Sequence, residues 1–131
     1  MKEINILWFK KDLRIYDNEA LFESLKDSDI LPIYIIEKDI WAQHTYSDRQ
    51  WQFCKESILD LRHELKKIGQ PLIIRMGNVL QIFEEISYKF KIKGIYSHQE
   101  TGDWLTFKRD NQVKVWASAK NIIWKEYIQF S

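Results

Sequence analysis

The chain has 131 residues, 45% hydrophobic and 30% charged, which is enough for one folded domain over residues 1–131 with a sizeable core. Its 20 basic and 19 acidic residues give a net charge of +1, so no excess of positive charge marks a surface for nucleic acid or membrane. The single cysteine, Cys54, excludes an internal disulfide and fits a cytoplasmic setting, and no apolar run is long enough to span a membrane.

The first third of the chain predicts two strands joined by a helix. The near-continuous apolar run 4–9 is typical of a strand covered on both faces. A charged loop follows, and Asp17 can cap a helix whose apolar side consists of Ala20, Leu21, Phe22 and Leu25. Residues 30–36 predict the second strand, which leads into a polar loop over residues 37–46.

The middle of the chain predicts a long helix over residues 47–67. Ser47 and Gln50 form a capping box at its start, and Gly69 with Pro71 ends it. Apolar residues at three- and four-residue steps form one stripe that we expect to face the core: Trp51, Cys54, Ile58, Leu61, Leu65 and Ile68.

The last part of the chain repeats the alternation of strands and helices. Strands are predicted at 72–75, 94–97 and 122–124, and helices follow the first two of them. Asn78 and Gln81 form a second capping box, and the helix at 103–119 directs Val113, Trp116 and Ala117 inward. The buried face of the helix after residue 78 consists of Val79, Ile82, Phe83, Ile86 and Phe90.

Five strands alternating with four helices predict an α/β fold, a Rossmann-like doubly wound five-stranded parallel sheet flanked by helices. Ligands in such sheets lie outside the carboxyl ends of the strands. Those ends are the segments 9–14, 37–41, 76–78 and 98–102. From this placement we select five candidate ligand-binding residues: Phe9, Lys10, Trp41, Gln99 and Gly102.

Several familiar sites are missing from the sequence. The four glycines form neither G-x-G-x-x-G nor a P-loop, which argues against a dehydrogenase or a P-loop ATPase. No catalytic set and no metal-ligating cluster is recognisable, since His44, His63 and His98 are isolated. We interpret these three histidines as surface or capping residues.

The charged residues near the strand ends allow two interpretations each. Lys10, Lys11 and Arg14 either grip an anion or pair with nearby carboxylates such as Asp12 and Asp17. A cation in the first turn of a helix, such as Arg49, opposes the helix dipole, which favours a contact made elsewhere. Likewise, Glu100 and Asp103 either cap the last helix or contact a ligand.

Four blocks of sequence resemble the DNA photolyase/cryptochrome family. The opening is Trp8-Phe9-Lys10-Lys11-Asp12-Leu13-Arg14 with Asp17-Asn18 and Ala20-Leu21, where the family usually has arginine in place of the two lysines. The others are Trp41-Ala42-x-His44-x-x-Ser47-x-Arg49-Gln50, Leu61-x-x-Glu64-Leu65-x-x-Ile68-Gly69-x-Pro71-Leu72, and Glu100-Thr101-Gly102 with Arg109-Asp110 and Val113. Together the blocks cover nearly the whole chain in the right order.

The resemblance implies an N-terminal antenna domain. In this family such a domain holds a deazaflavin, a reduced folate or a flavin, which passes excitation to FAD in a helical C-terminal domain. That domain, absent here, carries the light-driven DNA repair and the contact with damaged DNA, so the intact protein is expected to be a carbon–carbon lyase and this chain alone inactive. A stand-alone nucleotide-binding module and a docking domain without chromophore are the alternatives.

The resemblance also implies site residues. A deazaflavin-type pocket would use Ile35, Glu37, Arg49 and Glu100. The ring of Trp41 either stacks on the chromophore or fills the pocket. The 6 tryptophans allow the same two interpretations, as core residues or as the lining of a pocket.

Overall fold

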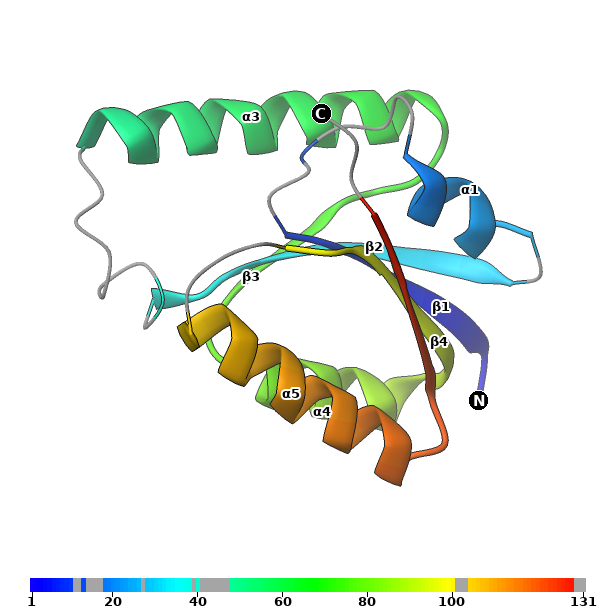
Figure 1. The fold of residues 1–131 in the computed structure, drawn as a ribbon. Coiled ribbons are helices and arrows are strands. Elements are labelled where there is room, and N and C mark those ends of the chain that lie inside the picture. The colour runs from blue at the N-terminus through cyan, green and yellow to red at the C-terminus, as the bar shows by residue number, and fades with distance from the viewer. Residues whose placement is uncertain are drawn as a thin grey trace.

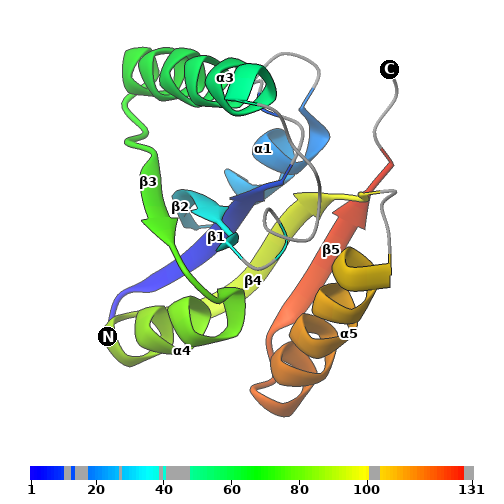
Figure 2. The same ribbon diagram turned by 90° about the vertical axis from the view of Figure 1, so that its left-hand side faces the viewer.

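A computed structural model describes residues 1–10, 13, 18–26, 28–38, 40, 48–100 and 104–128. It contains one sheet of five strands in the order β3-β2-β1-β4-β5, and every pair of neighbours is parallel. The strands are β1 (Glu3–Phe9), β2 (Asp29–Ile36), β3 (Ile73–Met76), β4 (Lys91–His98) and β5 (Ile123–Tyr127). The predicted doubly wound parallel sheet is therefore confirmed, and Figure 2 shows the strands in this order.

Helices cover both faces of the sheet. They are α1 (Glu19–Ser24), α3 (Asp48–Lys67), α4 (Val79–Lys89) and α5 (Trp104–Ala119). Figure 1 shows α1 and α3 on one face, and α4 and α5 on the other. Two helices begin at asparagine caps: Asn18 Oδ1 accepts from the Leu21 N–H at 2.8 Å, and Asn78 Oδ1 accepts from the Gln81 N–H at 3.1 Å. The cap that we predicted at Asp17 is thus one residue later, and Asp17 itself lies outside the described residues.

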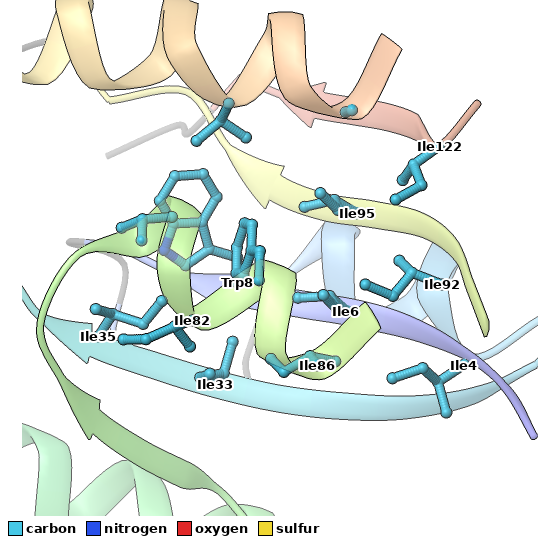
Figure 3. Packing of buried hydrophobic residues seen from close by; sticks show 14 residues of the cluster. Ile4, Ile6, Trp8, Ile33, Ile35, Ile82, Ile86, Ile92, Ile95 and Ile122 are labelled. Carbon is cyan, nitrogen blue, oxygen red and sulfur yellow. The ribbon is translucent and has the colours of Figure 1, made fainter. Parts of the chain in front are cut away.

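The core on the α4/α5 face is built mainly from isoleucines of the strands around one indole (Figure 3). Trp8 is 1% exposed, and its ring lies 5.3 Å from that of Phe83 of α4 in an edge-to-face arrangement. Alternate residues of the strands point to this side, as in Ile4, Ile6 and Trp8 of β1. Through this core the carboxyl half of β1 packs against α5, whose Val113 and Ala117 belong to the same cluster.

The core on the α1/α3 face differs from the prediction in two ways. Phe22 is 60% exposed, because α1 packs against the sheet through Ala20, Leu21 and Ser24 instead. The carbonyl of Ser24 accepts from Asn5 Nδ2 of β1 at 3.0 Å, so this short helix approaches the sheet through small residues. Leu25, Trp51 and Ile68 are also partly exposed, and the stripe of α3 is buried only at its centre.

Candidate functional site

The carboxyl ends of β1, β2 and β4 bring charged residues together at one edge of the sheet. The chain runs from β1 outward to β3 and then returns to β4 beside β1, which makes the gap between β1 and β4 the topological switch point. Lys10 follows β1, Glu37 follows β2, and Glu100 lies two residues beyond β4. These three predicted residues are the ones that the structure joins in one cluster.

Arg109 of α5 links the segments after β2 and β4. Its Nη1 donates to Glu37 Oε1 at 2.6 Å, its Nη2 donates to Glu100 Oε1, and its Nε donates to Asp110 Oδ1 at 3.0 Å. The side chain is only 9% exposed, and its guanidinium carbon lies 5.0 Å from the centre of the Trp8 ring. One buried cation therefore holds carboxylates from the ends of β2 and β4.

Lys10 occupies a second position in the same cluster. Its Nζ lies 3.2 Å from both carboxylate oxygens of Asp110 and 3.8 Å from Glu126 of β5. It also lies 4.4 Å from the ring centre of Trp8 and 5.1 Å from that of Trp124. Of the two interpretations of this lysine, the ion pair is present, and its partners among the described residues are Asp110 and Glu126.

Among the described residues, Lys10 and Arg109 form ion pairs with four carboxylates: Glu37, Glu100, Asp110 and Glu126. No buried side-chain nitrogen or oxygen of these described residues lacks a partner. Burial raises the pKa of Glu37 to about 7, even though Arg109 opposes the shift. Burial likewise raises the pKa of Glu126, against the effect of Lys10. The arginine stays charged, because three carboxylates raise its pKa although burial alone would lower it.

A carboxyl group with a pKa of about 7 suits ligand recognition. Glu37 exchanges a proton near neutral pH, so it can donate a hydrogen bond when protonated or accept one when ionised. A ring with both a donor and an acceptor on its edge would find both functions here.

A cleft of about 410 Å³ opens beside the cluster, within the usual size range of small-molecule sites. It lies between the end of β2, the turn from β3 into α4, and the first half of α5. Its walls include Glu37, Lys38, Asn78, Val79, Lys108 and Arg109. The pair Glu37 and Arg109 thus forms the boundary between cluster and cleft.

The other predicted site residues that the structure describes are not part of the cluster. Phe9 and Ile35 are buried in the cores on opposite faces of the sheet. Arg49 and Gln99 are exposed, and the backbone N–H of Gln99 donates to the carbonyl of Tyr127 at 2.7 Å. Trp41 and Gly102 lie outside the described residues, as do Lys11, Asp12, Arg14, His44, Ser47 and Asp103.

Two observations correct or extend the sequence analysis. His98 is 3% exposed rather than a surface residue, because it ends β4 beside the ring of Tyr127, with ring centres 6.2 Å apart. The site selection missed Arg109, which lies on the buried stripe of α5 with Thr106, Val113 and Ala117. An arginine at three- and four-residue steps among buried residues is the signal, because a buried cation requires partners.

Two kinds of structural feature are absent from the described residues. Within residues 1–128, gaps excepted, no helix combines the length and apolar character required to cross a membrane. In the same part of the chain, no three histidine, cysteine or acidic side chains are grouped so that they could hold a metal ion.

Comparison with known proteins assigns the family. The family model described as DNA photolyase matches residues 5–128. Cryptochrome DASH of Arabidopsis thaliana is 34% identical, over 76% of this chain and 19% of that relative, and the Solanum lycopersicum protein of the same name is 33% identical. The chain thus spans about a fifth of the length of these curated relatives.

Solved structures share the fold. A Synechocystis cryptochrome superposes with a TM-score of 0.82 at 24% identity, over 96% of this chain and 27% of that one. A Sulfolobus tokodaii photolyase crystallised with two FAD molecules gives a TM-score of 0.77 at 23% identity, over 96% of this chain and 29% of that one. With the match of the family model to residues 5–128, the chain belongs to the DNA photolyase/cryptochrome family as an N-terminal α/β domain.

Proposed function

We propose that this chain is a light-harvesting domain that holds an antenna chromophore at the carboxyl edge of its sheet. The chromophore would be a deazaflavin, a reduced folate or a flavin, and it would pass excitation to FAD in a helical C-terminal domain. The observation that carries the proposal is the cluster of Glu37 and Glu100 on Arg109 at the switch point. The Sulfolobus tokodaii photolyase supports it, since its two FAD molecules are described as implying a novel light-harvesting cofactor.

In this proposal the low net charge of the chain assigns DNA binding to the helical domain and not to this one. A net charge of +1 offers little attraction for DNA, so damaged DNA would be bound by the helical domain, and this cytoplasmic chain alone would repair nothing. A gel shift with damaged duplex at low salt tests this point. Binding at nanomolar concentrations of the chain would contradict it.

A binding assay tests the chromophore site itself. The chain is incubated separately with a deazaflavin, a reduced folate and a flavin, freed of unbound ligand, and its near-ultraviolet and visible absorbance is recorded before and after denaturation. We expect one chromophore to remain bound and to be released on unfolding. If all three preparations show protein absorbance only, the docking alternative holds, which the complete internal pairing of the cluster favours.

Arg49 provides a variant for the same assay. Arg49 is exposed in the first turn of α3, so Arg49→Ala should leave stability within about 0.5 kcal/mol while weakening chromophore binding. Arg62→Ala, an exposed position on the same helix, is the matched control. An unchanged affinity of the Arg49→Ala variant for the chromophore would show that Arg49 is not part of the binding site.

A further inference from the structure

The cleft beside the cluster differs from the cluster in the charge of the residues that line it. Its walls come from three segments, and its volume is about 410 Å³. Glu37 is the one acidic residue among the described residues that line it, and the guanidinium of Arg109 already binds that carboxylate. The charge that faces the cleft is therefore mainly positive.

Two lysines supply that charge, one from the segment after β2 and one from α5. Lys38 follows β2 and Lys108 lies in the second turn of α5, and both side chains are exposed. Throughout the described residues, neither lysine forms an ion pair with a carboxylate. The Nζ of Lys108 lies 5.5 Å from the ring centre of Trp104, which leaves its N–H groups available for an anion.

The third wall offers backbone donors. The helix α4 has eleven residues and begins with Val79 and Leu80 in the wall of the cleft. Asn78 Oδ1 binds the Gln81 N–H, so this capping contact leaves the first two N–H groups of the helix to other acceptors. Gly77, with a φ of 143°, makes the turn that places them there.

We propose that this cleft binds a phosphate-bearing ligand, with the phosphate between Lys38, Lys108 and the N–H groups of Val79 and Leu80. Two lysines and the backbone N–H groups of a helix start, around a cavity of this volume, match a phosphomonoester or diphosphate. Two sources share this chemistry: the tail of a phosphorylated flavin, or a free diphosphate group. The first source rests on the proposed antenna function, with the flavin ring at Glu37 and the tail in the cleft.

Two titrations separate these sources. In the first, inorganic pyrophosphate is added to the isotope-labelled chain, and we expect amide shifts at Val79 and Leu80. In the second, FMN and riboflavin are compared, since they share a ring and differ in the phosphate. If the tail occupies the cleft, FMN should bind about fivefold more tightly than riboflavin. Amide shifts with pyrophosphate but equal affinities for FMN and riboflavin would support the site and assign it to a free diphosphate.

Charge-removing variants complete the test. Lys38→Gln and Lys108→Gln should each raise the dissociation constant of pyrophosphate by about fivefold, because each removes one exposed cation. Lys89→Gln, in the last turn of α4, is the matched control and should have no effect. The absence of shifts at Val79 and Leu80, with the Lys38 and Lys108 variants equal to this control, would overturn the proposal. Pyrophosphate needs no chromophore, so that result is independent of any failure to bind an antenna ring.

Discussion

Charged residues lie at both ends of β1, β2 and β4, but they are exposed at the amino ends and mostly buried at the carboxyl ends. At the amino ends of β1, β2 and β4, Lys2 pairs with Asp29 at 3.1 Å and Lys91 pairs with Glu3 at 3.7 Å. All four side chains there are at least 48% exposed. At the carboxyl ends, the side chains of Lys10 and Arg109 are 1% and 9% exposed.

The difference supports the proposal that the carboxyl end of the sheet carries the function. Exposed ion pairs add little stability, whereas buried charges require desolvation that their mutual attraction offsets only with good geometry. A fold that needed only stability would fill the carboxyl edge with apolar residues, as it fills both faces. The buried cluster around Arg109 is therefore consistent with the proposed ligand site at this edge.

The largest expected effect comes from removing the guanidinium. Arg109→Met leaves Glu37 and Glu100 buried without their cation, so the free energy of unfolding at pH 8 should fall by about 3–5 kcal/mol. Urea denaturation followed by circular dichroism measures the loss. Arg109→Lys keeps the charge but cannot reach three carboxylates at once, so its loss should be intermediate. Equal stabilities for the Met and Lys variants would show that packing, not charge, holds the cluster.

Removing the lysine should have a smaller effect. In Lys10→Met the side chain still fits between the indoles of Trp8 and Trp124, and Asp110 keeps its bond from Arg109. We expect the free energy of unfolding to fall by about 2 kcal/mol, because the negative charges of Asp110 and Glu126 are then less well compensated. The same denaturation assay applies. A loss as large as that of Arg109→Met would contradict the view that Arg109 is the central cation.

The proton on Glu37 predicts a pH dependence. Its pKa rises from 4.5 in the unfolded chain to about 7 in the folded one, so the folded state keeps a proton that the unfolded state has released. Stability should therefore fall as the pH rises from about 4.5 to about 7, by at most about 3 kcal/mol. Glu37→Gln should remove most of that fall and be more stable than the original chain at pH 8. Glu56→Gln, on the exposed face of α3, should leave the pH profile unchanged.

Sequence periodicity predicted β1, β2 and β4 because strands buried on both faces contain a continuous apolar run. The second strand, predicted at residues 30–36, is observed at Asp29–Ile36. Periodicity failed at the two ends of the apolar stripe of α3. Trp51, in the first turn of the helix, is 37% exposed, and Ile68, one residue beyond its end, is 47% exposed, because periodicity gives the direction of a side chain and not whether the sheet extends beneath it.

Only the site residues at the ends of strands were predicted from the sequence. Lys10 was selected from the carboxyl end of its strand, and the family resemblance implied Glu37 and Glu100; a parallel sheet of this order brings all three segments to one edge. The shared partner of Glu37 and Glu100 was not predicted, since Arg109 comes from a helix and its direction depends on how α5 packs. The indole of Trp124 beneath Lys10 is set by the pairing of β5 with β4, which a sequence does not specify residue by residue.

The smallest effect on stability is expected for the exposed ion pairs at the amino end of the sheet. Lys2→Ala and Lys91→Ala each remove one partner of an exposed pair, and each should change the free energy of unfolding by less than about 1 kcal/mol. Added salt should reduce even this change, because exposed charges are screened, whereas the loss in Arg109→Met should persist. The measurement is urea denaturation of the three variants at low and high salt. A loss in Lys2→Ala that matched the Arg109 variant would mean that burial does not separate the two ends, and the assignment of function to the carboxyl edge would lose its physical basis.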